Sequence, residues 1–201
     1  MKYLNQLDYE TVPYPTNDKE PESPLAAEGN IALAGCGICS AAMMLEQLLL
    51  GEYSLEEIRD LAVSCKANLD PGTDMKVLGP ELCSRYGLVL QMSDSTEDLL
   101  ECLKTGGRVI INVGGDREGH TGVFSHGGHY ILAVACQENT VTVLDPSWKK
   151  DKFDEPDRKG KVIVQYPFCI CSTEVLKDDT ANRTPAYYCF KRRTDGTETK
   201  A

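Results

Sequence analysis

Cys36 is the residue whose surroundings most clearly suggest chemistry. It lies between Gly35 and Gly37 and opens an apolar run that continues to Leu50. This run predicts a buried helix that begins at the cysteine and ends at Gly51. Backbone N–H groups at a helix start lack helical partners, and the helix dipole there favours an anion. A thiol in this position is therefore easily ionised to a nucleophilic thiolate.

A thiol nucleophile needs a base, and histidine is the usual one. His129 begins an apolar segment that predicts a strand, and Asp145 ends the next predicted strand, residues 141–144. A hairpin that turns at residues 137–139 would place His129 directly across from Asp145, within reach of a hydrogen bond. The spacing therefore predicts a site that combines a cysteine, a histidine and an aspartate.

Each member of this set also has an ordinary structural explanation. A free cysteine is usually a buried core side chain, a histidine at a loop end can bind backbone groups, and Asp-Pro commonly starts a turn. The other histidines fit the hairpin less well, since the same register puts His126 opposite Trp148 and gives His120 no obvious partner. We favour the three residues acting together because the combination is more specific than any one of them.

The elements that would position these residues form a helical half followed by a strand-rich half. Residues 1–33 carry closely spaced prolines, which predict irregular structure. Further elements are predicted as helices at 54–64, 73–86 and 95–104, a turn at 70–72, strands at 88–90, 109–113, 129–134, 141–144, 162–164 and 186–190, loops at 114–128 and 149–161, and a short helical turn after Ser172. Helices first and antiparallel strands second predict an α+β fold.

Length and charge limit the class of protein. The 201 residues suit one domain, which we assign to residues 1–192, with a disordered polar tail at 193–201. The 21 Lys and Arg against 31 Asp and Glu give a net charge of −10, which argues against nucleic acid and anionic membranes as partners.

The expected location follows from the apolar segments and the cysteines. No apolar run is long enough to span a bilayer, and no signal peptide is visible at the start. The nine cysteines are an odd number, so we expect free thiols in a cytoplasmic protein, with a trimmed secreted form as the alternative.

The chain resembles the stand-alone relatives of the bacteriocin-processing cysteine peptidases, which are of family 39 type within the papain-like superfamily. The resemblance rests on three segments: Gly35-Cys36-Gly37-Ile38-Cys39-Ser40-Ala41-Ala42-Met43, Gly127-Gly128-His129-Tyr130-Ile131-Leu132 and Val143-Leu144-Asp145-Pro146-Ser147. It implies a helical lobe packed on an antiparallel sheet, with the cleft between them. It also implies Cys36 as nucleophile, His129 as base and Asp145 as the residue that orients the base. A peptide or small amide would be the substrate, and no cofactor or metal is implied.

The same resemblance implies an amide side chain, upstream of the cysteine, that helps to stabilise an oxyanion. Relatives often carry this amide in a Gln-x-Asp pattern near the start, which Gln6-Leu7-Asp8 matches, so Gln6 is the candidate. Asn30 is the alternative because it is closer in sequence to Cys36, and either could be an ordinary surface amide. The second donor would be the backbone N–H of Cys36.

The chain departs from the family pattern at Cys39, where relatives usually carry Thr, Ser or Ala. Cys36 and Cys39 form a C-x-x-C at a helix start, as in thioredoxin-like oxidoreductases, although no clear strand precedes them. A metal site that adds Cys169 and Cys171 would have poor zinc spacing. We rank a cysteine peptidase first, thiol redox second and a catalytically inactive peptide-binding domain third.

Cys39 also suggests a redox hypothesis within the first of these functions. It lies one helix turn from Cys36, so mild oxidation could join the two sulfurs in a strained disulfide. The alternative is that Cys39 is a small buried side chain standing in for Ser or Ala.

Overall fold

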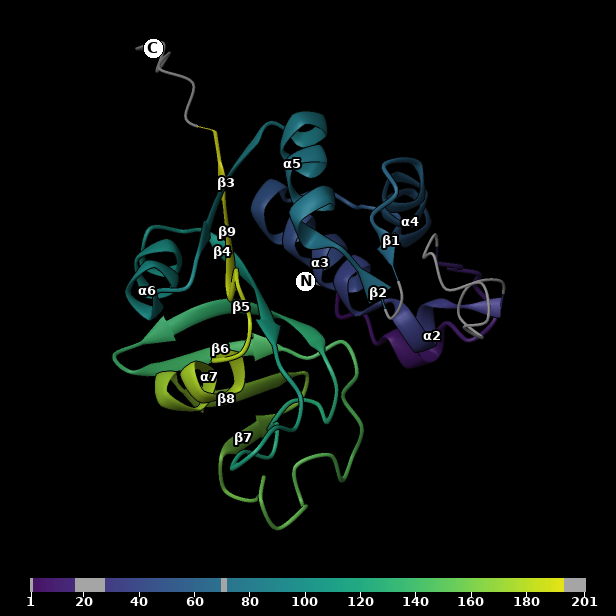
Figure 1. Cartoon of the computed structure of the whole chain (residues 1–201). Coiled ribbons are helices and arrows are strands. Elements are labelled where there is room, and N and C mark those ends of the chain that lie inside the picture. The colour runs from purple at the N-terminus through teal and green to yellow at the C-terminus, as the bar shows by residue number, and fades with distance from the viewer. Residues whose placement is uncertain (1, 17–27, 70–71, 194–201) are drawn as a thin grey trace, which may run out of the picture.

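The computed structural model describes residues 2–16, 28–69 and 72–193, in which helices pack against a large sheet (Figure 1). Most of the turn predicted at 70–72 and of the tail predicted at 193–201 lies outside the described residues. In chain order the elements are η1 (Gln6–Asp8), α2 (Ile31–Ala34), α3 (Cys36–Leu49), α4 (Leu55–Ser64), β1 (Asn68–Leu69), β2 (Gly72–Thr73), α5 (Met75–Tyr86), β3 (Leu88–Ser93), α6 (Thr96–Lys104), β4 (Arg108–Val113), β5 (His129–Gln137), β6 (Thr140–Leu144), β7 (Val162–Gln165), β8 (Phe168–Ser172), α7 (Thr173–Thr180) and β9 (Tyr187–Arg192). The predicted α+β class is confirmed.

Side-chain caps start most of the helices where the sequence predicts them. Ser54 accepts a hydrogen bond from the first turn of α4, Ser95 does so for α6, and Ser172 does so for α7. Helix α5 ends at Gly87, which adopts the left-handed conformation expected of a glycine at this position (φ 66°). Helix α7 has eight residues and is longer than the single turn that the sequence predicted.

The N-terminal segment is more regular than predicted. Asn5 and Asn30 each accept a hydrogen bond from a backbone N–H two or three residues later, and these caps start the short helices η1 and α2. Helix α3 ends one residue before the predicted limit, because Leu50 takes the left-handed turn (φ 56°) that we expected of Gly51.

The main sheet has seven strands in the order β3-β9-β4-β5-β6-β8-β7, and all neighbouring strands are antiparallel. The last strand, β9, is inserted between β3 and β4 and therefore lies inside the sheet. Strand β8 was not predicted from the sequence, although its cysteines lie in an apolar segment. Strand β5 occupies the middle of the sheet and pairs on both sides, so its first residue, His129, is held on a rigid element.

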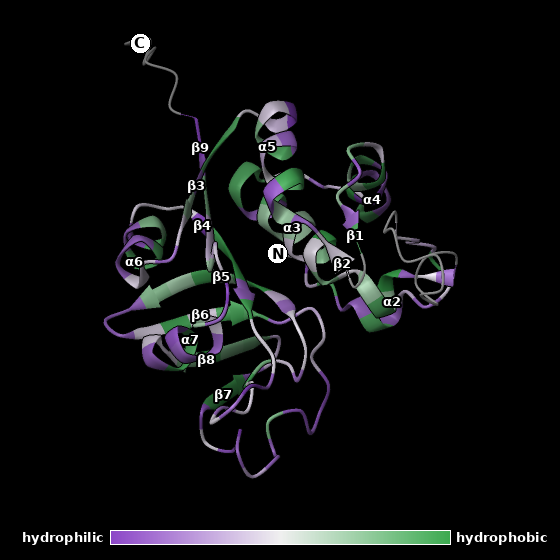
Figure 2. Ribbon diagram, in the orientation of Figure 1, coloured by the Kyte–Doolittle hydropathy of each residue, from purple (hydrophilic) through white to green (hydrophobic). Residues whose placement is uncertain are grey.

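The two faces of the sheet have separate cores. Alternate strand residues point to opposite faces. Ile110, Leu132 and Tyr188 pack with α3, α4 and α5, whereas Val109 and Ile131 pack with α6 and α7. Figure 2 shows hydrophobic colouring along these inner strands and hydrophilic colouring on the loops beyond β6. The helical layer that carries Cys36 is thus fixed to one face of the sheet that carries His129.

The hairpin of β5 and β6 has a different register from the one that spacing predicted. Gln137 pairs with Thr140, and the pairing shifts by one residue at a bulge between Ala133 and Ala135. Continuing the register from the pair Leu132 and Leu144 puts Ser147, not Asp145, across from His129. The predicted direct opposition was therefore wrong, and Asp145 is instead a diagonal neighbour of the histidine.

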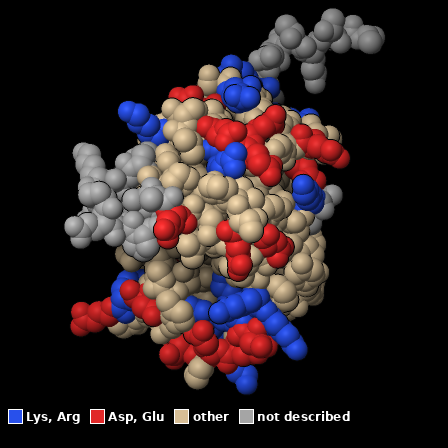
Figure 3. Space-filling view, turned by 90° about the vertical axis from the view of Figure 1, so that its right-hand side faces the viewer, with Lys and Arg blue, Asp and Glu red and all other residues tan. Residues whose placement is uncertain are grey.

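The mixed-charge segment 149–161 is a loop, as predicted, but it is not fully solvated. Lys152 is 5% exposed and Arg158 is 3% exposed, because both side chains turn inward to polar partners. Figure 3 shows the remaining acidic and basic side chains mixed at the lower end of the molecule, where this loop lies. The charge pattern alone did not distinguish the two buried cations from their solvated neighbours.

Candidate active site

Cys36 is the first residue of α3, as the sequence predicted. Gly35 precedes the helix and offers no side-chain cap, so no side chain covers the N–H groups of the first turn. A Cβ atom on Gly37 would lie 2.7 Å from Cβ of Thr73, so the helix start packs tightly on β2. Cys36 is 9% exposed and borders a cavity.

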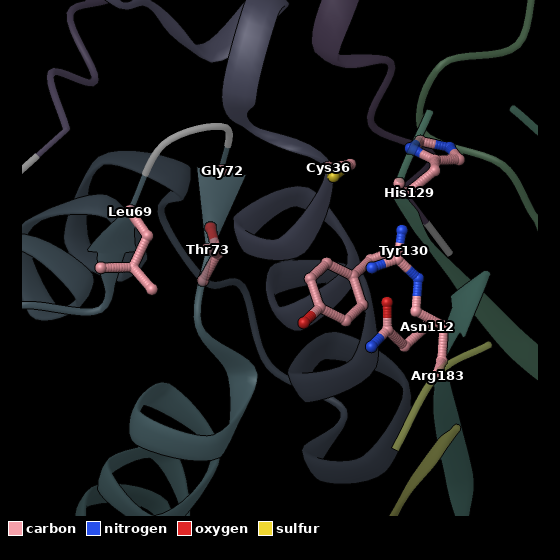
Figure 4. A pocket seen from close by; sticks show the side chains of 9 residues that line it. Cys36, Leu69, Gly72, Thr73, Asn112, His129, Tyr130 and Arg183 are labelled. Atoms are coloured by element: carbon pink, nitrogen blue, oxygen red, sulfur yellow. The ribbon is translucent and has the colours of Figure 1, made fainter. Parts of the chain in front are cut away.

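His129 connects the cysteine to Asp145. The His129 Nε2 atom lies 2.8 Å from Oδ1 of Asp145, and both side chains are buried. Since Nε2 faces the carboxylate, Nδ1 is free to face the thiol. Figure 4 shows the imidazole beside Cys36 with a ring nitrogen turned toward it, and the interaction of the two groups lowers the pKa of the thiol. The structure therefore brings Cys36, His129 and Asp145 together in a chain of contacts.

Cys36 and His129 shift each other's pKa in opposite directions. Burial raises the pKa of the Cys36 thiol, but the hydrogen bond and charge of His129, with nearby backbone N–H groups, outweigh it and leave the pKa below its usual value. Burial lowers the pKa of His129, but the hydrogen bonds with Asp145 and Cys36 outweigh it and leave that pKa above its usual value. These opposite directions favour a thiolate beside an imidazolium.

Asp145 is held by more groups than the sequence indicated. Its carboxylate accepts hydrogen bonds from the N–H of Ser147 (2.9 Å) and from Nζ of Lys152 (2.6 Å). The Ser147 hydroxyl lies 3.0 Å from Nε2 of His129 and accepts from Lys152 at 2.7 Å. Burial raises the pKa of Asp145, but the charge of Lys152 and the hydrogen bond to His129 hold it well below its usual range. The carboxylate is therefore ionised and fixed in position.

The two candidate amides occupy different environments. Gln6 is 5% exposed and donates from Nε2 to the Ala32 carbonyl at 2.7 Å, while its backbone N–H donates to Pro146 at 2.6 Å. It therefore bridges α2, just before Cys36, and the residue after Asp145. Asn30 instead caps α2 through its side chain. Both amides thus have structural roles, but the second Nε2–H of Gln6 is still available as a donor.

A cavity of about 300 Å³ opens at the cysteine, between the helical layer and the sheet. Its walls come from both halves of the chain and from the segment after α7 (Figure 4). They are formed by Cys36, Leu69, Gly72, Thr73, Asn112, Gly128, His129, Tyr130 and Arg183. The lining is mixed in polarity and suits a peptide better than a purely apolar ligand.

The structure disfavours the two alternative uses of Cys36. All nine cysteines are free thiols, and α2 rather than a strand precedes Cys36, unlike the βαβ context of a thioredoxin motif. Cys39 is fully buried. Its pKa is raised mainly by this burial and to a smaller extent by the charge of the nearby Cys36. Within the described ranges, no three His, Cys, Asp or Glu side chains are placed to hold a metal ion, so the cluster with Cys169 and Cys171 is not formed.

The other two histidines bind carboxylates away from the cavity. His120 lies 2.8 Å from the buried Asp179, so the expectation that it lacks a partner was wrong. His126 contacts Asp116 at 2.8 Å and Glu155 at 3.0 Å rather than facing a tryptophan. Both interactions tie down the loop of residues 114–128, which leads into His129.

Sequence reasoning missed several residues around the site. Ser147 and Lys152 contact Asp145, and Asn112, Tyr130 and Arg183 line the cavity. Ser147 and Tyr130 lay within segments that the sequence had singled out, but no role had been assigned to either. The others come from a strand and two loops in which nothing in the residue pattern marks a contact with the site.

Comparison with known proteins identifies the fold. No protein-family model matches the chain, and no curated protein matches it in sequence. In structure it is similar to the peptidase domain of Streptococcus ComA, a bi-functional ABC transporter involved in a quorum sensing pathway, with a TM-score of 0.50 and 14% identity over 79% of this chain and 91% of that one. It is also similar to a Bacillus anthracis protein described as a C39-like peptidase, with a TM-score of 0.54 and 14% identity over 92% of this chain and 97% of that one.

These likenesses show a C39-type, papain-like peptidase fold, which confirms the fold that the sequence resemblance predicted. At this level of identity they do not extend to the activity. In the part of the chain that the structure describes, no helix is long and apolar enough to cross a membrane.

Proposed function

We propose that this chain is a cysteine peptidase that cleaves peptide bonds through a thioester on Cys36. The observation that carries the proposal is the chain of contacts from Cys36 through His129 to Asp145 at the edge of a cavity in a peptidase fold. The directions of the pKa shifts at Cys36 and His129 favour the thiolate and imidazolium that such an enzyme needs at rest.

The reaction follows from these groups. The Cys36 thiolate attacks the peptide carbonyl carbon, and the carbonyl π electrons move to oxygen to give a tetrahedral oxyanion. The oxyanion accepts hydrogen bonds from the N–H of Cys36 and from Nε2 of Gln6. His129 then gives its proton to the leaving amine, and the C–N bond breaks to leave a thioester.

Water completes the cycle. Neutral His129 takes a proton from water, the hydroxide adds to the thioester, and collapse of the second oxyanion expels the Cys36 thiolate. Asp145 keeps the imidazole oriented with Nε2–H toward the carboxylate and stabilises its charged form. An amidase or an acyl transferase would use the same thioester, so the acceptor and leaving group have to be identified by experiment.

The test uses a peptide mixture prepared by digesting a whole proteome, with cleavage sites identified by mass spectrometry of both fragments. Cys36→Ala and His129→Ala should abolish cleavage, whereas Asp145→Ala should retain more activity. In a comparable serine peptidase the losses are roughly 10⁶-fold for the nucleophile or base and roughly 10⁴-fold for the aspartate. Cys83→Ala is the matched control, because this half-buried thiol lies on α5, away from the cavity.

Two results would contradict the proposal. Near wild-type cleavage by His129→Ala would exclude the histidine as base and would favour thiol redox chemistry. Absence of both cleavage and a fast-reacting thiol at residue 36 would favour a catalytically inactive peptide-binding domain.

A further inference from the structure

Apart from the pair of Cys36 and His129, Arg183 is the only charged side chain among the described residues that line the cavity. It enters from the segment between α7 and β9. Figure 4 shows its guanidinium group extending past Asn112 and beside Tyr130, toward Cys36 and His129. A permanent positive charge therefore stands in the same cavity as the candidate nucleophile.

No acceptor for the Nε atom of Arg183 is found within the described part of the chain. Among the described residues, no carboxylate forms a salt bridge with Arg183, and its buried Nε has no hydrogen-bond partner. The buried Arg158 also has a nitrogen, Nη2, that is unpartnered within the described ranges, but it donates to the Gly122 carbonyl at 2.8 Å and lies 3.4 Å from Glu155. A buried donor without an acceptor costs free energy, which an incoming anion would recover.

The surrounding chain is shaped to hold the guanidinium there. A Cβ atom on Gly128 would lie 2.6 Å from Nη2 of Arg183, so the guanidinium packs closely over the glycine that precedes His129. The backbone N–H of Arg183 donates to the Thr180 carbonyl at 2.8 Å, which fixes the start of the side chain at the end of α7. The position of the charge is thus set by contacts on both sides.

We propose that Arg183 binds a carboxylate of the substrate, so that the enzyme cleaves peptides carrying an anionic group near the scissile bond. This inference rests on the proposed function and adds a substrate class to it. A guanidinium group binds a carboxylate through two parallel hydrogen bonds. The net charge of −10 disfavours anionic substrates at long range, so their recognition has to come from direct contact with Arg183.

The cavity limits where the anionic group can lie. Cys36 and Arg183 share one space of about 300 Å³, and each residue of an extended peptide advances about 3.3–3.6 Å. The carboxylate therefore lies within about three residues of the cleaved bond. An Asp or Glu side chain and a free C-terminus offer the same chemistry, and the experiment below separates them.

The first test needs no peptide substrate. Iodoacetate and iodoacetamide alkylate the same thiolate by forming an S–C bond and releasing iodide, and they differ mainly in charge. Arg183→Met should lower the ratio of the iodoacetate rate to the iodoacetamide rate at Cys36 by about tenfold, the loss expected for one charged contact. The same ratio at Cys83 is the internal control.

Matched variants make the first test specific. Arg85→Met, which removes an exposed arginine on α5, should leave the ratio at Cys36 unchanged. Gly128→Ala keeps the arginine but fills its space, so it should lower the ratio as well, and it serves if Arg183→Met fails to fold. A ratio in Arg183→Met within twofold of wild type would overturn the proposal.

The second test uses pairs of synthetic peptides with Glu or Gln at each of three positions on either side of a cleaved bond, each made with a free and an amidated C-terminus. We expect kcat/KM to favour Glu by about 10- to 100-fold at one position, and Arg183→Met to abolish this preference. A preference for the free C-terminus instead would identify the chain end as the source of the carboxylate. Equal Glu-to-Gln ratios in wild type and Arg183→Met at every position, with no preference for the free end, would refute the inference.

The two tests also separate this inference from the proposed function. Cleavage that requires Cys36 but ignores charge would leave the peptidase proposal standing and refute the role of Arg183. A charge-dependent alkylation ratio without any peptide cleavage would support the anion site and contradict peptide hydrolysis.

Discussion

Lys152 and Asp145 form a buried ion pair directly behind His129, and removing the lysine should destabilise the protein. Nζ of Lys152 lies 2.6 Å from Oδ2 of Asp145, and the two side chains are 6% and 0% exposed. Lys152→Met keeps the length and the apolar stem of the side chain but removes its charge. The carboxylate of Asp145 then stays buried with His129 and Ser147 as its remaining partners.

The expected loss of stability depends on the partners that Asp145 keeps in Lys152→Met. Removing one partner of a buried ion pair costs about 3–5 kcal/mol. Asp145 keeps its contact with His129 at 2.8 Å and its hydrogen bond from the N–H of Ser147 at 2.9 Å. We therefore expect a loss of about 3 kcal/mol, at the lower end of this range. For a domain of this size that corresponds to a fall of about 6–12 °C in Tm.

The loss should depend on pH in a defined direction. The pKa of Asp145 in the folded protein lies below its unfolded value of about 3.9. The stability contributed by its ionised form is therefore complete above the unfolded pKa and is lost as the pH falls through the folded pKa. Lys152→Met raises the folded pKa, so the difference between wild type and variant is largest near pH 7 and shrinks in acid.

Urea unfolding at pH 7 and at about pH 3, which is below the unfolded pKa of Asp145, followed by circular dichroism, measures this difference. Lys150→Met is the matched control, because Lys150 is exposed on the same loop. A double-mutant cycle with Asp145→Asn isolates the pairwise interaction, and the double variant should recover part of the loss. A loss below about 1 kcal/mol at pH 7, or a difference that grows in acid, would refute the reasoning.

Three further outcomes concern the thiols and the base. Brief labelling with iodoacetamide near neutral pH, read by mass spectrometry, should modify Cys36 before the other cysteines. Burial raises the pKa of Cys83 to about 11, so earlier labelling of Cys83 would count against the site. Asp145→Asn should shift the basic limb of the pH–rate profile to lower pH because His129 loses the carboxylate that raises its pKa, whereas an unmoved limb would exclude this coupling. After peroxide treatment, dithiothreitol should restore the activity of wild type and of Cys39→Ser equally, because the raised pKa of the buried Cys39 thiol disfavours its reaction with an oxidised Cys36. Greater recovery of activity in wild type would support the disulfide hypothesis.

The sequence predicted the elements that have apolar segments or clear capping residues. Short apolar runs predicted β4, β5 and β6, and the capping residues predicted α4 and α6 to within a few residues. The register of the β5–β6 hairpin was missed because its two-residue turn, Glu138 and Asn139, lies later in the chain than the turn centred on Gln137 that the spacing predicted. The bulge near Val134 moves the pairing back by one residue and so reduces the error, and a bulge leaves no mark in an apolar pattern. The pair of His129 and Asp145 was nevertheless found, because a diagonal neighbour is still within reach of a side chain.

The residues that complete the site were not predictable from spacing. Lys152 lies among exposed charges in a loop, and only its contact with Asp145 distinguishes it from them. Arg183 follows α7 and is more than fifty residues from His129 in sequence, yet its guanidinium touches the space above Gly128. Such contacts depend on how the layers pack, and one sequence does not contain that information.

The N-terminal segment explains how two separate layers can hold one site. Cys36 belongs to the helical layer and Asp145 to the sheet, so their geometry depends on the contact between the layers. The hydroxyl of Tyr3 donates to the Asp145 carbonyl at 2.5 Å, the amide of Asn5 donates to the Trp148 carbonyl at 2.8 Å, and Gln6 bonds both α2 and the residue after Asp145. These bonds join the N-terminal segment and α2, which directly precedes α3, to the loop that carries the carboxylate. Gln6, the proposed oxyanion donor, is therefore also part of the connection that holds the nucleophile, the base and the carboxylate in position.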